Sequence, residues 1–346
     1  MGGCIYACTH KAFTAPPDPF YRPLFCGAAI PGRESFGYLR DETGENISLK
    51  NPYYSELSGM YWIWKNDTEN EILGLCHYRR YLLDRDRRLF TEKTAKKALT
   101  EYDAVTTKRV ILDHPYREAF GGRHNLRDFE LLEQAVGKLF PEYMDDFCEI
   151  ASGRETYFGN MLIAKRDLFS EYSAWLFALL SVVEKDVDMT GYNDYQKRLY
   201  GFLSELLLMV YLKHNGLNVL ECDVAVLGGK KETGEVLEAV AGCFRNRDLD
   251  GAARVFMDCY EKRPDILMEA SDVDGKLKLV TQMLATFRAE QEQTGHNYLE
   301  RERELSVLFT QFRDLNTAVK EAKSPGFVTI KTPLSEIAIR IAEKLK

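Results

Sequence analysis

The chain has 346 residues, a net charge of −7, 45% hydrophobic residues and 12% aromatic residues. Its length exceeds the usual ~100–200 residues of one domain, so one large domain or two unequal domains are expected, and the apolar content excludes intrinsic disorder as a class. The acidic balance argues against broad binding of nucleic acid, although an acidic protein can hold a local basic pocket for a phosphorylated substrate.

The cysteines and the N-terminus predict a reduced, cytoplasmic protein. Eight cysteines between Cys4 and Cys259 form no Cys-x-x-Cys pair or Cys/His cluster, so a structural zinc site is not expected. No basic segment followed by a sustained apolar run opens the chain, which argues against an export signal. The most apolar stretches, 174–183 and 202–212, are shorter than the roughly 20 residues that span a bilayer, and they are expected to be buried helices.

The beginning of the sequence alternates apolar runs with polar loops. Ile5–Thr9 is expected to be a buried strand, and the loop that follows contains His10, Lys11 and several prolines. A polar loop at the end of a strand suits a ligand site. The next expected elements are a strand at Leu24–Ala29, a loop at 41–51 and a helix at Tyr54–Asn66.

Strands and helices continue to alternate up to residue 227, which predicts an α/β sheet. Glu71–Leu83 is expected to be a central strand, because its apolar residues lead directly into a charged segment. The other expected elements are strands at Ala104–Thr107, Phe158–Ala164 and Asn218–Leu227, and helices at Asn125–Leu139, Arg166–Lys185 and Asp194–Lys213.

Beyond this point nearly every periodic segment is helical, so a domain boundary is expected near Lys230, between residues 1–229 and a helical region at 230–346. The first two helices resemble a tetratricopeptide-like hairpin, but one hairpin does not bury its own face, and packing against the first domain is favoured. The apolar stripe of the fourth helix is expected to pack in a core. The four expected helices are Val236–Phe244, Leu249–Glu261, Asp274–Thr294 and Tyr298–Lys323.

The end of the chain has an amphipathic pattern. Leu334, Ile337, Ile341 and Leu345 recur at helical spacing beside basic residues. Two interpretations stay open, a helix that lies on a membrane surface and a helix that docks on its own protein.

Two adjacent arginines lie where the expected central strand leaves the core, in the segment Gly74–Tyr81. Arg79 and Arg80 are costly at the end of a buried strand unless they meet anions, which a diphosphate or neighbouring carboxylates would supply. The planar guanidinium suits phosphate oxygens. In the preceding helix, Ser55, Glu56 and Lys65 are less easily explained as core residues than the aromatic residues around them. They are candidates to face a ligand near the helix ends, but plain surface exposure is the favoured interpretation for each.

Several separated motifs resemble one known family. They are Thr9-His10-Lys11, Asp41 with 44–48, Asn51–Asn66, His77–Tyr81, Gly159-Asn160-Met161 and Arg198–Glu205. In this order they resemble the bacterial capsular-polysaccharide glycosyltransferases grouped as domain of unknown function 4422, some of which are linked with galactofuranosyl transfer. The resemblance covers about the first 220 residues.

The resemblance implies a GT-A-like fold that transfers a hexosyl group from a uridine diphosphate (UDP) sugar to a glycan or lipid-linked glycan acceptor. It also implies an acceptor site in the later segments of the domain and peripheral contact with the inner face of the cell membrane. The residues expected to bind the nucleotide-sugar are Thr9, His10, Lys11, Asn51, Ser55, Lys65, His77, Arg79 and Arg80.

Asp84-Arg85-Asp86 matches the Asp-x-Asp motif with which many GT-A enzymes hold Mn²⁺ or Mg²⁺ against the diphosphate. Asp84 and Asp86 are therefore candidate metal ligands. The alternative is an exposed, salt-bridged turn, with His77, Arg79 and Arg80 neutralising the leaving group without a metal.

Inverting transfer needs a carboxylate that removes the proton of the acceptor hydroxyl. Asp194 and Glu205 are the candidates, since they precede or occupy a largely apolar helix and burial would raise the pKa of either one. The alternatives are a helix N-cap for Asp194 and an ion pair with Arg198 for Glu205. A competing interpretation of the whole chain is a noncatalytic scaffold of a polysaccharide-synthesis assembly.

Overall fold

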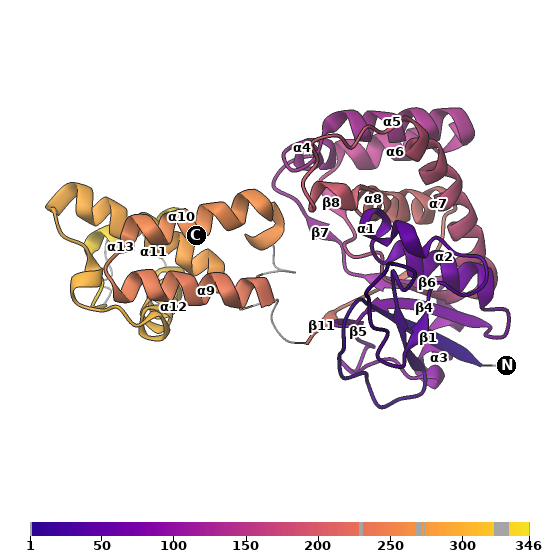
Figure 1. Cartoon of the computed structure of the whole chain (residues 1–346), viewed down its shortest axis with the longest axis horizontal. Coiled ribbons are helices and arrows are strands. Elements are labelled where there is room, and N and C mark those ends of the chain that lie inside the picture. The colour runs from indigo at the N-terminus through magenta and orange to yellow at the C-terminus, as the bar shows by residue number, and fades with distance from the viewer. Residues whose placement is uncertain (1, 228–230, 268–271, 273, 322–331, 346) are drawn as a thin grey trace. The chain divides into compact units, whose positions relative to one another are not determined.

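The computed structural model describes residues 2–227, 231–267, 272, 274–321 and 332–345. The chain divides into two compact units, residues 1–227 and residues 228–346, and each is described by itself (Figure 1). The domain boundary expected near Lys230 lies outside the described residues.

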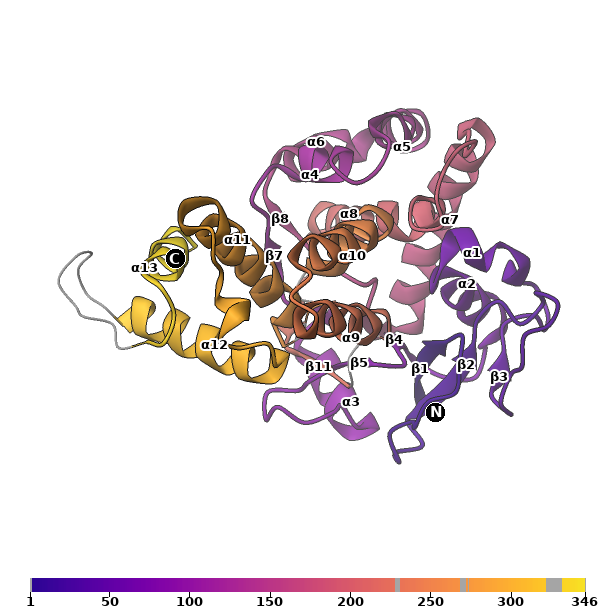
Figure 2. The ribbon, with the colours of Figure 1, turned by 60° about the vertical axis from the view of Figure 1, so that its left-hand side comes forward.

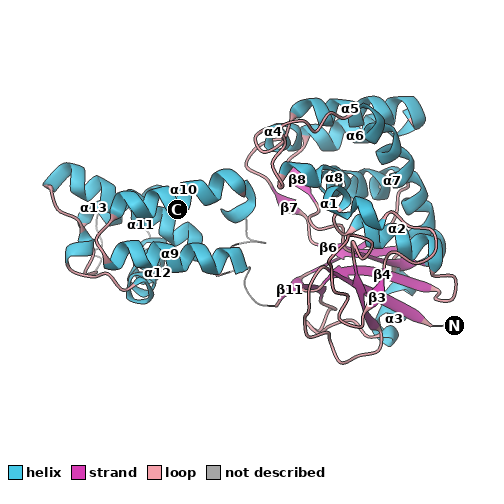
Figure 3. Ribbon diagram, viewed as in Figure 1, coloured by secondary structure: helices cyan, strands magenta, loops and turns pink. Residues whose placement is uncertain are grey.

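The first unit is built on a nine-stranded sheet with helices on both faces (Figure 3). Its main path runs β10-β6-β9-β4-β1-β2-β3, and β5 pairs with β4 and β11. The strands are β1 Gly3–Thr9, β2 Tyr21–Phe25, β3 Leu39–Arg40, β4 Ile72–His77, β5 Arg80–Leu82, β6 Ala104–Thr107, β9 Leu162–Lys165, β10 Val219–Cys222 and β11 Val224–Val226. A separate two-stranded sheet joins β7 Val110–Ile111 to β8 Glu155–Thr156.

The sheet is mixed, because β9 runs antiparallel to both β4 and β6. Strands β1, β2, β3 and β4 are parallel neighbours, and Figure 2 shows them at one side of the first unit. Thr9 pairs with Phe25, Cys8 with His77, and Phe25 with Arg40. The carboxyl ends of these four strands therefore meet at one edge of the sheet. In open α/β sheets, ligands bind outside this edge.

Alternation along the strands separates two apolar layers. Cys4, Tyr6 and Cys8 of β1 join the larger core, and Ile5 and Ala7 join the smaller one. Because side chains alternate between the faces of a strand, His77 follows Leu73 and Leu75 onto the face of the larger core. The helices that contribute to the larger core are α1 Asn51–Tyr54, α2 Leu57–Asn66, α4 Tyr116–Gly121, α5 Leu126–Leu139, α6 Met144–Ser152, α7 Arg166–Asp186 and α8 Leu199–His214, and α3 Glu92–Glu101 covers the smaller one.

Four elements are shorter or more interrupted than the sequence predicts. The helix expected at Tyr54–Asn66 is interrupted at Ser55, whose φ of 52° and ψ of −130° lie outside the helical region. The strand expected at Glu71–Leu83 reverses through Tyr78 and Arg79, so that His77 pairs with Arg80. The strand expected at Asn218–Leu227 is divided into β10, which pairs with β6, and β11, which pairs with β5. The helix expected from Asp194 begins at Leu199 as α8, after a short 3₁₀ turn at Gln196–Arg198.

The second unit is helical and has an apolar core of its own. Its helices are α9 Lys231–Arg245, α10 Leu249–Lys262, α11 Lys276–Thr294, α12 Leu305–Glu321 and α13 Glu336–Lys344. Phe244, Phe287 and Phe312 meet in this core, and the apolar stripe of α12 is buried there as expected. The hairpin α9–α10 thus buries apolar residues among the other helices of its unit.

The terminal helix α13 docks on its own unit through Ala338 and Ala342, which are buried in the core with Leu334. Ser335 caps it by accepting a hydrogen bond from the Ala338 N–H. None of the helices in the described part of the chain combines the length and the apolar character needed to cross a bilayer.

Candidate functional site

Three segments that are far apart in the sequence converge near the carboxyl edge of the sheet. They bring together Glu56, His77, Arg80, Arg198 and Glu205, here called the acidic–basic cluster. Each member is half-buried. Each of the three other members, Glu56, His77 and Arg198, interacts electrostatically with Arg80, with Glu205 or with both. Because half-buried charges interact more strongly than surface charges, this arrangement is typical of a site that handles charged groups.

The Gly159 peptide joins two members of the cluster. Its N–H donates to Glu205 Oε1 at 2.9 Å, and the distance between its carbonyl oxygen and His77 Nε2 is 2.5 Å. A carbonyl only accepts, so His77 carries its proton on Nε2. Gly159 has a φ of 88°, which only glycine adopts without strain.

Asn160 locks this turn in place. Its side-chain Nδ2 donates to Glu56 Oε1 at 2.7 Å and to the Gly201 carbonyl at 3.0 Å, and its Oδ1 accepts from Ser204 Oγ at 2.9 Å. Asn160 is itself left-handed, with a φ of 51°. Buried polar side chains with all these partners are rigid, so the turn presents Gly159 in one orientation.

The environment shifts the pKa of three cluster members. Burial raises the pKa of Glu205 to about 8, with the Glu56 charge adding to the rise and the Gly159 N–H opposing it. Burial also lowers the pKa of His77, so its imidazole is neutral near pH 7 and acts through its N–H. Burial lowers the pKa of Arg80 as well, but an arginine starts so high that it remains a cation.

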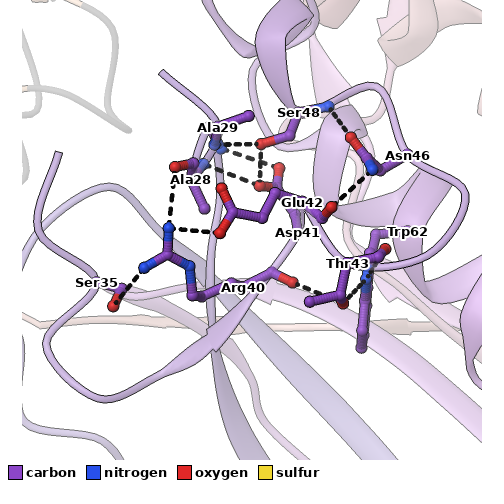
Figure 4. A network of polar contacts seen from close by, with 11 residues as sticks. Ala28, Ala29, Ser35, Arg40, Asp41, Glu42, Thr43, Asn46, Ser48 and Trp62 are labelled. Carbon is purple, nitrogen blue, oxygen red and sulfur yellow. Dashed lines mark hydrogen bonds and ion pairs between the residues drawn. The ribbon is translucent and has the colours of Figure 1, made fainter. Parts of the chain in front are cut away.

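A second polar network fixes the loops beside this cluster (Figure 4). The Asp41 carboxylate is fully buried and accepts the N–H groups of Gly27 and Ala28 at 2.9 and 3.0 Å. Ser48 Oγ and Ser58 Oγ also donate to it, at 2.5 and 2.8 Å. Asp41 thereby connects the turn after β2 to the starts of α1 and α2. Each of its two carboxylate oxygens accepts two hydrogen bonds from protein groups.

The strand ends next to this network carry a basic and aromatic group around Tyr78. Lys11 Nζ and the Arg79 guanidinium lie 5.3 and 5.4 Å from the centre of the Tyr78 ring, and the His10 ring meets it edge-on at 5.6 Å. Thr9 is buried, and its Oγ1 accepts from the Lys11 N–H at 3.1 Å. Thr9 therefore shapes the turn that presents His10 and Lys11.

Asn51 and Ser55 connect this edge to α8. Asn51 accepts from Arg33 at 3.0 Å and donates to the Ser55 carbonyl at 2.8 Å. Ser55 Oγ accepts from Arg198 Nε at 3.1 Å. Both residues thus position other groups in this structure.

Lys65 lies at the far end of α2 from Glu56. Its Nζ pairs with Glu45 Oε1 at 3.2 Å and stands 3.8 Å from the centre of the Trp64 ring. The structure does not bring Lys65 to the carboxyl edge, because α2 runs antiparallel to β1 and ends near Asp67, which bonds Tyr6.

The two candidate bases have different surroundings. Asp194 is fully exposed and pairs with Lys197 at 3.2 Å in a surface loop, whereas Glu205 belongs to the acidic–basic cluster. Glu205 and Arg198 are both described residues, and no ion pair joins them.

The Asp84–Asp86 segment forms a turn after β5. Asp84 Oδ1 accepts the N–H groups of Asp86 and Arg88, both at 3.0 Å, and Asp86 is exposed. Within the described ranges, no group of three or more His, Cys, Asp or Glu side chains is arranged to hold a metal ion. Asp84 and Asp86 remain a predicted metal site, because the oxygens of a bound diphosphate would add to their two carboxylates as ligands.

A family model described as Domain of unknown function (DUF4422) matches residues 4–216, from β1 to the end of α8. This chain belongs to that family. Every member of the acidic–basic cluster lies within this DUF4422 domain, and the helical unit that begins at residue 228 lies beyond it.

A solved structure shows the same kind of fold. The DUF4422 chain resembles the WbbM bifunctional glycosyltransferase in its apo form, with a TM-score of 0.58 and 26% sequence identity. The match covers 70% of this chain and 51% of that chain, so this chain spans about half the length of the relative. No curated protein matches it. The predicted α/β sheet with flanking helices and a helical C-terminal region is confirmed, and the similarity indicates a glycosyltransferase-like role.

Sequence reasoning overlooked Arg198 and Ser204 as site residues and left Glu56 as a general candidate. Their contacts cross from α8 to the breaks at Ser55 and Gly159, which no local pattern reveals. The one usable signal was the Gly-Asn pair at 159–160, since this pair favours left-handed turns.

Proposed function

We propose that this chain is an inverting glycosyltransferase that moves a hexosyl group from a UDP-sugar to a surface-polysaccharide acceptor. The donor diphosphate binds at the carboxyl ends of β1 and β4, beside Lys11, Arg79 and Arg80. The sugar lies toward Glu205. The family resemblance suggests galactofuranosyl as the transferred group.

The convergence of the acidic–basic cluster carries this proposal. A chain with a net charge of −7 places arginines and a neutral histidine together at the edge where α/β sheets bind ligands. Arginine guanidinium groups match the oxygens of a diphosphate, and they stabilise the negative charge that develops on the leaving group.

Glu205 is the proposed general base. Its carboxylate takes the proton of the acceptor hydroxyl while the hydroxyl oxygen forms a bond to the anomeric carbon of the donor. The bond from that carbon to the diphosphate oxygen breaks on the opposite side, and its electron pair leaves with UDP. A base with a raised pKa is stronger than an ordinary carboxylate, which suits removal of a proton from an alcohol.

Ligand-induced stabilisation tests the binding part of the proposal. The melting temperature would be measured with UDP, other nucleoside diphosphates and UDP-sugars, each with Mn²⁺ and with a chelator. We expect UDP ligands to stabilise the protein without a metal, because a ligand that binds only the native state raises its stability. No shift with any nucleotide would favour the scaffold alternative, and a shift only with Mn²⁺ would favour Asp84 and Asp86 as metal ligands.

Substitution of the two strand-end arginines is the matching residue test. We predict that Arg79→Ala with Arg80→Ala lowers UDP affinity by at least about a hundredfold, because each removed charge-assisted contact accounts for about 1.5–3 kcal/mol. Titration calorimetry measures the affinity. Arg85→Ala with Arg87→Ala removes two exposed arginines of the next turn and is the matched control. Equal loss in both double variants would contradict the assignment.

The acceptor is proposed to be a lipid-linked glycan reached from the membrane surface. The observation that favours this is the side of α13 not used in docking, where Arg340 and Lys344 are exposed and Ile337 and Ile341 are half-buried. The exposed Leu345 follows directly after the helix. Basic and apolar side chains on one helix suit an anionic membrane surface.

A further inference from the structure

Arg198 is held in a fixed orientation without using its terminal nitrogens. Its Nε donates to Ser55 Oγ at 3.1 Å, and its guanidinium carbon lies 5.2 Å from the centre of the Phe202 ring. Among the residues that the structure describes, no hydrogen bond or ion pair involves an Nη group of Arg198. A half-buried guanidinium of this kind has its two Nη groups available to donate hydrogen bonds to a ligand.

The backbone around Ser55 is built to bring it to Arg198. Ser55 has a φ of 52°, and Asn51 holds its carbonyl at 2.8 Å. Gly201 leaves room for this approach, since a side chain there would begin 3.3 Å from Ser55 Cβ. The break between α1 and α2 therefore has a use, which is to present a hydroxyl to the start of α8.

Arg198, Phe202 and Glu205 are spaced by four and three residues, so they share one face of the segment that leads into α8. Arg198 also lies close enough to Arg80 and His77 to lower the pKa of both groups. Like charges gathered in a half-buried place are unfavourable until an anion enters between them.

We infer that Arg198 binds the phosphate of the nucleoside diphosphate that is attached to the transferred sugar, with Ser55 as its positioning residue. This inference rests on the proposed function. Of the basic residues in the cluster, Arg198 shares a helical face with the proposed base Glu205, so it lies at the sugar end of the donor. The phosphate next to the sugar is the β-phosphate, and it carries the charge that develops as the bond to the sugar breaks.

Affinities for UDP and uridine monophosphate (UMP) test the inference, because only UDP has the β-phosphate. We expect Arg198→Ala to weaken UDP binding by about tenfold to a hundredfold and to leave UMP binding unchanged. Arg198→Lys keeps the charge but loses the Nε donor and the two-pronged geometry, so an intermediate loss is expected. Ser55→Gly keeps the backbone conformation, removes the hydroxyl and should lower the ratio of UDP to UMP affinity by a smaller factor.

The controls separate the possible failures. Arg127→Ala removes an exposed arginine of α5 and should leave both affinities unchanged. Equal UDP affinity in wild type and Arg198→Ala, or a parallel loss for UDP and UMP, would overturn the inference while the proposed function stands. If the wild-type protein binds neither nucleotide, the proposed function itself fails, and the inference fails with it. Should Arg198→Ala not fold, the Arg198→Lys and Ser55→Gly ratios decide.

Discussion

Glu205 shows how one side chain can be prepared for proton transfer by its neighbours. Burial favours its protonated form, and the Gly159 N–H donates to Oε1 and favours the carboxylate. The balance raises the pKa of Glu205 to about 8. A carboxylate with this pKa is a useful base near neutral pH, because it combines basicity with a substantial ionised fraction.

The transfer rate should therefore depend on pH through Glu205. A general base must be ionised, so a raised pKa means that kcat/KM increases as the pH rises and levels off above about 8. Glu205→Gln should lower the rate by about 10²–10⁴-fold and remove this dependence. UDP release in the presence of acceptor, measured from pH 5.5 to 9.5, gives both quantities.

Asp194→Asn is the matched control for this experiment, since it neutralises the other candidate carboxylate at a fully exposed position. We expect it to keep both the rate and the pH profile of the wild type. A rate lost in Asp194→Asn and retained in Glu205→Gln would exchange the roles of the two residues.

At the scale of elements, the close packing of α2 on the sheet places Glu56 at the site. Gly59 makes this contact possible, because a Cβ there would stand 2.7 and 2.8 Å from the sulfurs of Cys8 and Cys26. Both thiols are buried. The helix therefore approaches the strands more closely than any residue with a side chain permits.

Gly59→Ala should lower the free energy of unfolding of the first unit by about 1–3 kcal/mol, because overpacking a tight core forces side chains or backbone to shift. Denaturant titration measures this change. In Gly137→Ala, on α5, the new methyl group would lie 3.5 Å from the Met144 sulfur, an ordinary contact, and alanine should be neutral or stabilising by up to about 1 kcal/mol. Equal effects of the two substitutions would refute the close-packing argument.

The regular elements were predictable because each is long or strongly periodic. The strand at Ala104–Thr107 has the expected bounds, and the helices at Arg166–Asp186 and Leu126–Leu139 differ by one residue from expectation. The breaks at Ser55 and Tyr78–Arg79 were not predictable, because neither place carries the glycine or proline that usually marks a turn. These breaks carry much of the candidate site, since they aim Ser55 at Arg198 and return Arg80 to His77.

At the scale of the whole molecule, each unit has its own apolar core. The buried residues of the larger core of the first unit all lie within the DUF4422 match. The helices of the second unit enclose Val240, Met283 and Leu308 among others. Units with separate cores can carry separate tasks. The first unit holds the proposed chemistry, and we propose that the second positions the chain relative to its acceptor.

The exposed side of α13 makes this division testable. If it binds an anionic membrane surface, the protein should sediment with vesicles that contain phosphatidylglycerol and not with neutral vesicles, and added salt should weaken the association. Arg340→Glu with Lys344→Glu should abolish binding, because each basic residue near the surface contributes about 1 kcal/mol and the reversed charges are repelled.

These exposed positions spare the docked face of Ala338 and Ala342, so the fold of the unit is retained. Arg301→Glu with Lys320→Glu makes the same change in net charge at exposed positions outside α13 and should leave binding intact. Equal binding by the two double variants would assign any membrane contact to another surface.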